Sequence, residues 1–389
     1  MTISIFGFVS LVALGAWIYL VWGRANFWKA DQWLGPVPAK GPARPGVVAV
    51  VPARNEGETI ARTVKSLAAQ AYDGPFAIIV VDDASSDGTG DLARNAFEQS
   101  GAEHRFAVVE APPLEPGWTG KLAAMQAGVD AAAKLAPDAA FVWFTDADIV
   151  HGPKTLERLI AKTHEGNDLV SLMVRLHCRS FWERLLIPAF LFFFQMLYPF
   201  PAINARPPQI GGAAGGCLLV SLRALGSIDG LNAIKGALID DCTLAEAVRH
   251  KGFYLWLGHA DDSRSLRRYE NLAEIWNMVA RTAYTQLDYS PAKLAGTVLG
   301  MALVFLVGPL AVLLAPWHGS ALALLCGLGV VALMIKAYAP TLRIYAKGPL
   351  AALTLPAAAA LYTAMTADSA RRHWQGEGGA WKARTYDFG

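Results

Sequence analysis

Long apolar runs frame a more polar middle in this chain of 389 residues. The first run, residues 3–23, carries no charged side chain and is long enough to cross a hydrocarbon core of about 30 Å as a helix. A second uncharged run, residues 294–335, is interrupted only at residues 316–320, which predict a tight turn between two spans. The pattern therefore predicts membrane helices towards both ends of the chain.

Two further apolar segments fit the membrane in more than one way. Residues 348–367 are rich in alanine and contain Pro349 and Pro356, so a re-entrant or interfacial segment fits them as well as a full span. Residues 180–204 are aromatic and contain prolines and few charges. We expect this second segment to lie in the membrane surface rather than to cross it.

Basic residues predict the orientation. Arg24 and Lys29 follow the first run and place that side in the cytoplasm. A cleaved signal peptide is disfavoured, because the first residues lack a positive charge. Basic residues after the two later spans, and again in the tail, indicate the same side, so residues 348–367 are expected to be re-entrant. These residues are Lys336, Arg343, Lys347, Arg371, Arg372, Lys382 and Arg384.

The predicted organisation has four parts. They are an N-terminal helix (1–23), a cytoplasmic domain (24–291), C-terminal membrane segments (292–367) and a basic cytoplasmic tail (368–389). A hydrophobic fraction of 54% with 17% charged residues excludes an ordinary soluble enzyme. The net charge of +2 gives no reason to expect a nucleic-acid partner. The four cysteines show no CxxC spacing and are expected to be small buried hydrophobes in a reducing compartment.

Strand and helix patterns alternate in the polar middle. The run GVVAVVPA at residues 46–53 is the continuous apolar pattern of a strand buried on both faces of a parallel sheet. Further strands are predicted at 76–81, 105–113 and 140–149, with helices at 58–71, from Thr89, and at 120–136. This alternation predicts an open parallel α/β sheet, whose ligands bind beyond the carboxyl ends of the strands.

Acidic loops follow three of these strands. Each loop alone fits a solvated turn or a helix cap, but three at one sheet edge favour a site. Aspartates at i and i+2 leaving a strand project to one side, so Asp146 and Asp148 are predicted to share a hard divalent cation, Mg²⁺ or Mn²⁺. The residues singled out at the ends of these three strands are Pro52, Ala53, Arg54, Asn55, Glu56, Asp82, Asp83, Asp146 and Asp148.

Two later motifs add a cation and a second acidic pair. Lys121 opens a helix after two glycines, where backbone N–H groups favour an anion, so a diphosphate is expected there. A solvated loop lysine is the alternative. After the glycine-rich loop 211–216 and a strand, Asp240 and Asp241 stand before a helix at 242–250, as a helix cap or as a general base.

Five motifs, in this order and spacing, resemble the family 2 inverting glycosyltransferases with a GT-A fold. They are residues 48–52 with Asn55-Glu56, then VVDDASSDGT, GKLAAMQAG, DAD and IDDCTLA, and the resemblance covers residues 46–260. Together with the predicted spans and the tail HWQGEGGAWKARTYDFG, the chain is similar to the membrane branch that modifies lipids. Within that branch it looks most like the hopene-associated glycosyltransferases of bacterial hopanoid gene clusters.

The resemblance implies roles for the motif residues. Pro52, Ala53, Asn55 and Glu56 should line the nucleotide pocket, and Asp82 with Asp83 should meet the uracil or ribose of a UDP-sugar. Asp146 should face the ribose and the metal, Asp148 should bind the metal, and Lys121 should lie near the donor. Asp241 should be the catalytic base, although the family usually has Glu-Asp where this chain has Asp240-Asp241.

One departure limits the match. The Q/RxxRW motif of processive and ceramide-type members is absent after the base, which argues against a polymer-extruding synthase. Arg267, Arg268 or Arg281 can supply the phosphate-contacting cation instead, and we favour Arg281.

The resemblance thus implies a membrane-bound, metal-dependent glycosyltransferase at the cytoplasmic face of the bacterial inner membrane. It would move a sugar from a UDP-sugar to a lipid hydroxyl, with a hopanoid among the candidate acceptors. Three alternatives remain: a sugar-1-phosphate nucleotidyltransferase, which would need a GxGxR-type loop, a non-catalytic nucleotide-sugar-binding scaffold, and a polysaccharide synthase-like transferase.

Overall fold

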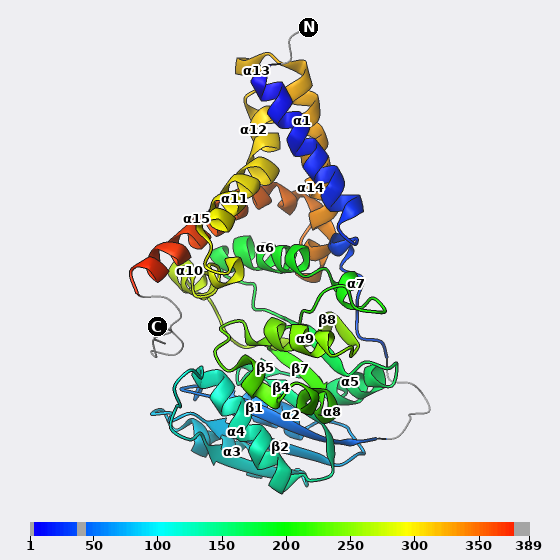
Figure 1. The fold of residues 1–389 in the computed structure, drawn as a ribbon, viewed down its shortest axis with the longest axis vertical. Helices are drawn as coiled ribbons and strands as arrows, with labels where there is room; N and C mark the ends of the chain where they lie inside the picture. The colour runs from blue at the N-terminus through cyan, green and yellow to red at the C-terminus, as the bar shows by residue number, and fades with distance from the viewer. Residues whose placement is uncertain (1–3, 37–43, 377–389) are drawn as a thin grey trace. The chain divides into compact units, whose positions relative to one another are not determined.

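The computed structural model describes residues 4–36 and 44–376 and divides into two compact units (Figure 1). One, the sheet unit, contains Gln32–His177 and Ala202–Arg268. The other, the helical unit, contains Cys178–Pro201 together with the segments before Gln32 and after Arg268. The unit that holds the sheet is therefore narrower than the predicted domain 24–291, because residues 178–201 and 269–291 pack with the terminal helices.

The described part of the sheet unit contains one eight-stranded sheet, in the order β3-β2-β1-β4-β7-β6-β8-β5. β1 pairs in parallel with β2 and β4, and β6 in parallel with β8. The strands are β1 (Gly46–Ala53), β2 (Phe76–Asp82), β3 (Arg105–Glu110), β4 (Ala139–Thr145), β5 (Ile149–Val150), β6 (Leu169–Arg175), β7 (Cys217–Ser221) and β8 (Leu255–Ser265). The prediction of a mostly parallel α/β sheet is confirmed.

β7 runs against both of its neighbours, β4 and β6. The carboxyl ends of β1, β2, β4, β6 and β8 therefore share one edge of the sheet with the amino end of β7. The loop that leads into β7, and not the one that leaves it, reaches this edge. Loops that follow five strands and the glycine-rich loop 211–216 can consequently meet there.

Burial explains why these segments become strands. All eight residues of β1 are buried, and burying a Val or Ile side chain contributes about 1.5–3 kcal/mol. Helices cover the sheet, and α4 lies so close to β1 that a Cβ on Gly128 would come within 2.3 Å of Val50 Cγ1. The helices are α2 (Ile60–Ala68), α3 (Thr89–Glu98), α4 (Gly120–Leu135), α5 (Thr155–Thr163), α8 (Leu222–Ser227) and α9 (Asp240–His250).

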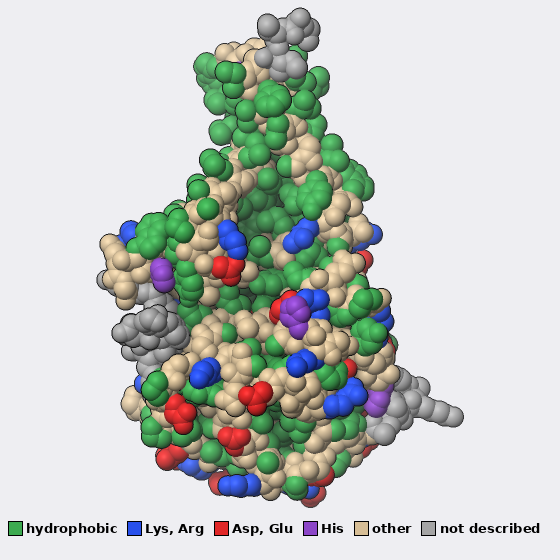
Figure 2. Space-filling view, in the orientation of Figure 1, with side chains coloured by type: hydrophobic (Ala, Val, Ile, Leu, Met, Phe, Trp, Pro, Cys, Tyr) green, Lys and Arg blue, Asp and Glu red, His purple; other side chains and the backbone are tan. Residues whose placement is uncertain are grey.

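The helical unit contains the apolar runs. Its longer helices are α1 (Ile5–Ile18), α6 (Phe181–Leu197), α10 (Leu272–Ala280), α11 (Pro291–Met301), α12 (Val307–Leu313), α14 (Ala321–Ile344) and α15 (Leu355–Trp374). The predicted break at residues 316–320 is confirmed: the short α13 (Ala315–His318) and Gly319 at φ +59° separate α12 from α14. Figure 2 shows hydrophobic side chains covering the outside of α1, α12 and α14.

Among the described residues, five helical stretches are long and apolar enough to cross a membrane. They are Ile5–Gly23, Phe181–Ile203, Pro291–Leu313, Ala321–Ile344 and Pro349–Trp374. The second is 67% buried and the third only 17%, so α6 is covered by its own unit whereas α11 and α12 present their surface outward. Which stretches cross remains a prediction. Lys382 and Arg384 of the predicted tail lie outside the described residues.

Glu183 ties the two chain segments that enter the helical unit. Its Oε2 accepts the N–H groups of Arg179 and Ser180, each at 2.8 Å, and its Oε1 accepts the N–H of Tyr269 at 2.8 Å. The side chain of Ser180 also donates to the carbonyl of Tyr269 at 2.9 Å. Glu183 is fully buried, and charge-assisted hydrogen bonds from three backbone N–H groups stabilise its carboxylate.

Candidate active site

Predicted site residues from four separate loops meet in one small pocket at the carboxyl edge of the sheet. The pocket is lined by Pro52, Lys121, Thr145, Asp146, Gly215, Asp240 and Asp241, with Met125, Phe144, Leu218 and Leu244 as its apolar walls. Its charged side chains are acidic apart from Lys121. The sheet topology accounts for the meeting, because every one of these loops belongs to the same edge.

Lys121 bridges two of the acidic segments. The Thr119 side chain caps α4 and sets Lys121 in its first turn, where Lys121 Nζ lies 3.1 Å from Asp146 Oδ1 and 3.0 Å from Asp240 Oδ2. Burial by itself would lower the pKa of Lys121, but the carboxylates of Asp146, Asp240 and Asp241 raise it above its ordinary value. Lys121 is therefore a fixed cation inside the pocket, and the alternative of a solvated loop lysine is wrong.

Asp241 is held by backbone donors on both oxygens. Its Oδ2 accepts the N–H of Gly215 at 2.7 Å and its Oδ1 accepts the N–H of Cys242 at 2.8 Å. Burial and the nearby charge of Asp240 raise the pKa of Asp241 to about 6, although Lys121 opposes the shift. α9 begins at Asp240 with Ile239 in the cap position, so neither aspartate is the N-cap of this helix.

Asp146 and Asp148 lie in a turn, which corrects one premise of the sequence prediction. β4 ends at Thr145 rather than continuing to residue 149, and the N–H of Ile149 donates to the Asp146 carbonyl at 3.2 Å before β5 begins. The two carboxylates are therefore presented by a turn and not by an extended strand. Burial, together with the charges of Asp148 and Asp240, raises the pKa of Asp146, and Lys121 partly offsets this.

Arg267 joins Asp148 to the loop after β1. Its Nε lies 3.2 Å from Asp148 Oδ2 and its Nη2 lies 2.8 Å from Glu56 Oε1. The Ser265 hydroxyl donates to the same Asp148 oxygen at 3.0 Å. Of the candidate arginines, Arg267 is thus part of the sheet unit's acidic edge, whereas the favoured Arg281 belongs to the helical unit at the end of α10.

The donor set fits one hard divalent cation. Among the described residues, Asp146 Oδ2 and Asp148 Oδ1 accept no hydrogen bond, so one oxygen of each carboxylate is available. No group of three His, Cys, Asp or Glu side chains gathers as a complete metal cage in the described part of the chain. Two carboxylates with the remaining positions open is the arrangement that Mg²⁺ or Mn²⁺ takes with phosphate oxygens and water.

The loops expected to hold the nucleotide are tied to each other. Asn55 adopts φ +50°, and its Oδ1 accepts the N–H of Ser86 at 2.9 Å. Asp82 Oδ1 accepts the N–H of Ser85 at 3.0 Å, and the buried Asp83 lies 3.5 Å from Arg54 Nη1. Pro52 and Ala53 are buried at the end of β1. These contacts hold the loops after β1 and β2 together. The contact of Asp82 and Asp83 with a base or ribose remains a prediction.

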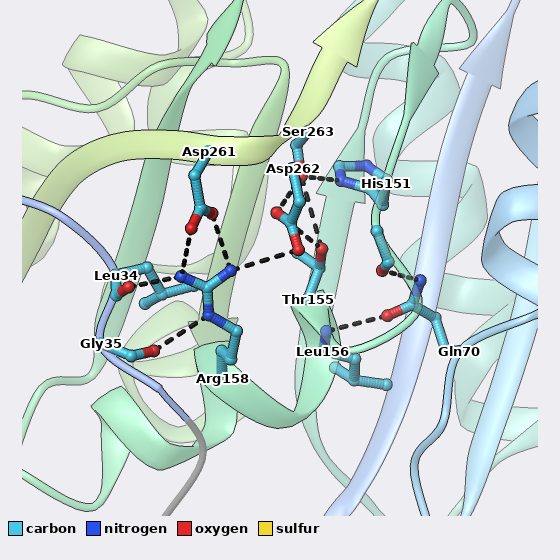
Figure 3. Close-up of polar contacts among 11 residues, drawn as sticks. Leu34, Gly35, Gln70, His151, Thr155, Leu156, Arg158, Asp261, Asp262 and Ser263 are labelled. Atoms are coloured by element: carbon cyan, nitrogen blue, oxygen red, sulfur yellow. Dashed lines mark hydrogen bonds and ion pairs between the residues drawn. The ribbon is translucent and has the colours of Figure 1, made fainter.

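A buried polar network behind the site was not predicted (Figure 3). His151 and Ser263 lie at its centre, and Arg158 on α5 donates to Asp261 at 2.7 Å and to the carbonyl of Gly35 at 2.9 Å. Gln70 accepts the N–H of Leu156 at 2.9 Å. Nothing in the sequence pattern marks these residues, because they are isolated polar positions whose partners lie far away in the chain.

Comparisons with known proteins agree with this geometry. Residues 48–228 match the model of the family described as Glycosyl transferase family 2. Over 140 residues the chain is 31% identical to the undecaprenyl-phosphate 4-deoxy-4-formamido-L-arabinose transferase of Serratia proteamaculans (strain 568). That match covers 36% of this chain and 39% of the relative, so the chain spans well under half of the relative's length.

A solved structure shares this fold. The mannosyltransferase PcManGT from Pyrobaculum calidifontis, in complex with GDP-Man and Mn²⁺, has a TM-score of 0.57 at 17% identity, over 94% of this chain and 99% of that chain. Glucosyl-3-phosphoglycerate synthase from Mycobacterium tuberculosis, in complex with Mn²⁺, UDP and glucosyl-3-phosphoglycerate, has a TM-score of 0.44 at 20% identity, over 66% and 86% of the two chains. Residues 48–228 therefore resemble a glycosyltransferase family 2 domain, and the fold is a GT-A-like α/β fold.

Proposed function

We propose that this chain is a membrane-bound inverting glycosyltransferase that moves a sugar from a UDP-sugar to a lipid hydroxyl. The observation that carries the proposal is the pair formed by Lys121 and Asp241 in one pocket. Lys121 is a partly buried cation near the expected diphosphate, and Asp241 is a carboxylate whose pKa is raised by burial. The family 2 domain supports the reaction class.

Asp241 is suited to accept a proton. Two backbone N–H groups fix its orientation, and a pKa of about 6 leaves it ionised at neutral pH and a better base than an exposed aspartate. In the proposed reaction it takes the proton of the acceptor hydroxyl as the acceptor oxygen attacks the anomeric carbon in line. A single displacement of this kind inverts the configuration at that carbon.

The opposite side of the pocket is suited to the leaving diphosphate. Asp146 and Asp148 would hold a divalent cation, Mg²⁺ or Mn²⁺, which when bound offsets the negative charge of the departing group. Lys121 adds a fixed positive charge without reorganisation. Arg267 is a second cation for the phosphates, and this assignment replaces Arg281 in the proposal because Arg267 already contacts Asp148 and Glu56.

The apolar helices support a lipid acceptor. The helical unit has five stretches long and apolar enough to cross a membrane, and Lys336 Nζ lies 4.9 Å and 5.6 Å from the ring centroids of Trp22 and Trp28. Such Lys–Trp clusters are typical of a membrane interface. We propose the cytoplasmic face of the bacterial inner membrane as the location and a hydroxylated hopanoid as the first acceptor to test.

A lipid phosphate is the second candidate acceptor, because the Serratia proteamaculans protein that resembles part of this chain is named as an undecaprenyl-phosphate transferase. The two acceptors differ in chemistry. A hydroxyl must lose its proton during attack, whereas a phosphate oxygen is already ionised at neutral pH and needs no base. Dependence of the rate on Asp241 therefore separates the two acceptors.

The test uses the full chain in lipid nanodiscs. UDP-glucose, UDP-galactose, UDP-N-acetylglucosamine and GDP-mannose are each supplied with Mn²⁺ and with a hydroxylated hopanoid, a diacylglycerol or undecaprenyl phosphate, and mass spectrometry detects glycosylated lipid. A glycosylated hydroxyl lipid from a UDP-sugar supports the proposal. Nucleotide binding without any lipid product would instead favour a non-catalytic scaffold.

A further inference from the structure

His151 stands at the centre of a buried hydrogen-bond chain that the proposed mechanism does not use. It follows β5, is 4% exposed, and its ring packs on Trp143 with centroids 4.6 Å apart. Its Nε2 lies 2.8 Å from Thr145 Oγ1 and its Nδ1 lies 3.0 Å from Ser263 Oγ. His151 therefore links β8 to the end of β4.

The hydroxyl of Thr145 determines which groups donate and which accept in these hydrogen bonds. The Thr145 hydroxyl donates its one proton to the carbonyl of Gly216 at 2.9 Å, so towards His151 it acts as an acceptor. His151 Nε2 must then carry the ring proton, and Nδ1 accepts from the Ser263 hydroxyl. Burial lowers the pKa of His151 to about 3, so the ring is neutral, as this arrangement requires.

Thr145 and Gly216, which are hydrogen-bonded to each other, are both next in sequence to residues of the site. Thr145 directly precedes Asp146 in the sequence. Gly216 directly follows Gly215, whose N–H donates to Asp241 at 2.7 Å. A shift of the His151 ring would consequently move the end of β4 and the loop before β7 relative to each other.

The far side of His151 is firmly anchored. Ser263 directly follows Asp262, whose Oδ1 accepts the Thr155 hydroxyl at 3.3 Å. Arg158 Nη1 contacts Asp262 Oδ2 at 3.2 Å and Asp261 Oδ1 at 2.7 Å (Figure 3). Asp262 is also closely packed against Gly152, because a Cβ on Gly152 would come within 2.3 Å of Asp262 Oδ2. The residues on the Ser263 side of His151 are therefore closely packed and hydrogen-bonded, and they fix the position of the imidazole relative to Thr145.

We propose that His151 is a positioning residue that sets the separation of the Asp146 and Asp241 carboxylates through Thr145 and Gly216. His151 itself hydrogen-bonds to neither carboxylate. The effect on sugar transfer rests on the proposed function, whereas the effect on the Gly215 contact does not.

The experiment compares His151→Phe with His104→Phe in the full chain. Phenylalanine keeps the ring against Trp143 but removes both hydrogen bonds. His104 is a matched control, since it is half-buried against Phe76 with ring centroids 5.1 Å apart and precedes β3 at the opposite edge of the sheet. His151→Gln, whose side-chain amide can donate to Thr145, is the conservative variant, and it keeps the proposal testable should the Phe variant fold poorly.

Two readouts are taken. Hydrogen exchange followed by mass spectrometry measures protection of the Gly215 amide, and steady-state kinetics measures kcat and KM for the nucleotide-sugar that the wild-type chain turns over. His151→Phe is expected to lose Gly215 protection and to lower kcat by about 10- to 100-fold with little change in KM, because misplacement of reacting groups by about 1 Å can cost 10²-fold. His151→Gln should recover most of both, and His104→Phe should match the wild type.

The outcomes separate the two proposals. Unchanged Gly215 protection in His151→Phe, or an equal loss of kcat in His104→Phe, overturns the positioning role. Lost protection in a chain whose wild type transfers no sugar supports the positioning role while the proposed function fails. Wild-type kcat in His151→Phe, in a chain that does transfer sugar, overturns the claimed effect on transfer.

Discussion

Gly215 donates its backbone N–H to the Asp241 carboxylate at 2.7 Å, across 26 residues of sequence. This contact joins the loop before β7 to the first turn of α9 and fixes one oxygen of the proposed base. The second oxygen is fixed by Cys242, so the carboxylate has a defined orientation before any substrate arrives. A base held in this way makes specific predictions about its replacement.

Replacing Asp241 with Asn should abolish sugar transfer and leave UDP binding intact. General bases contribute about 10²- to 10⁴-fold to the rate, and either orientation of the amide would turn its NH₂ towards a backbone donor. Transfer is measured by lipid mass spectrometry and UDP binding by calorimetry. Asp229→Asn, at an exposed position with φ +66°, is the control and should behave as wild type. Normal turnover by Asp241→Asn would disprove the base assignment.

The transfer rate should fall as the pH drops below about 6. Asp241 acts in its ionised form, and its raised pKa of about 6 places the loss of activity in this range. The same shift affects stability with a defined sign. The folded chain binds more protons than the unfolded chain between the ordinary pKa of 3.8 and about 6, so the contribution of Asp241 to the free energy of unfolding decreases as the pH rises through this window. Rate profiles and thermal unfolding at pH 4–8 test both statements, and a rate independent of pH would contradict the first.

Asp148→Asn should remove the benefit that Mn²⁺ gives to UDP binding. The variant keeps the size of the side chain but loses one of the two carboxylates that are proposed to hold the cation. Calorimetry of UDP with Mn²⁺ and with EDTA gives the difference for each protein. Asp138→Asn, at the opposite end of β4 where Asp138 pairs with Arg105, is the control. Equal Mn²⁺ responses in Asp148→Asn and the wild type would rule out this residue as a ligand.

Arg267→Ala should weaken binding of the nucleotide-sugar, and Arg267→Lys should restore only part of it. One guanidinium spans Glu56 and Asp148, whereas an ammonium is a point charge that cannot reach both in this geometry. We expect a rise in KM of about tenfold for the Ala variant, corresponding to the ~1.4 kcal/mol of one charge-assisted contact. Arg264, exposed on β8 and without a salt bridge among the described residues, supplies the matched Ala control. A similar KM in the two Ala variants would count against Arg267.

Glu183→Gln should destabilise the helical unit. Three backbone N–H groups donate to the oxygens of this buried carboxylate, so an amide nitrogen in its place would face a donor and leave it unsatisfied, at a cost of about 1–3 kcal/mol. Thermal unfolding in nanodiscs should show a lower midpoint. Glu274→Gln, where Glu274 is exposed at the start of α10, is the control. An unchanged unfolding midpoint in Glu183→Gln would show that the hydrogen bond between Glu183 and the N–H of Tyr269 is not needed for the stability of the helical unit.

The sequence predicted the first half of the sheet well because its strands are continuous apolar runs. β1, β2 and β4 begin within one residue of the predicted starts at 46, 76 and 140, since burial on both faces permits no other pattern. β8 carries the sequence GHADDSRS, whose two aspartates both pair with Arg158 on α5. Local pattern favours a loop there, and the strand forms because of a partner about a hundred residues away.

The candidate site shows the same limit. Its acidic motifs stood out because carboxylates at strand ends are chemically conspicuous, and the structure brings Lys121, Asp146, Asp240 and Asp241 together. His151 was missed, and Gly215 was singled out only as part of the glycine-rich loop 211–216, not as a partner of Asp241. Their role depends on which hydrogen bonds close in the folded chain, and that information is not present in the spacing of residue types.

Because β7 runs opposite to its neighbours, the loops at the two edges of the sheet have different roles. With one strand turned around, catalytic segments crowd a single rim, and the turns of the opposite rim are left with purely architectural duties. The turn at Gly101, between α3 and β3, belongs to that opposite rim and is exposed at φ +65°. An affinity tag or fluorescent probe inserted there would report on the protein without disturbing its chemistry.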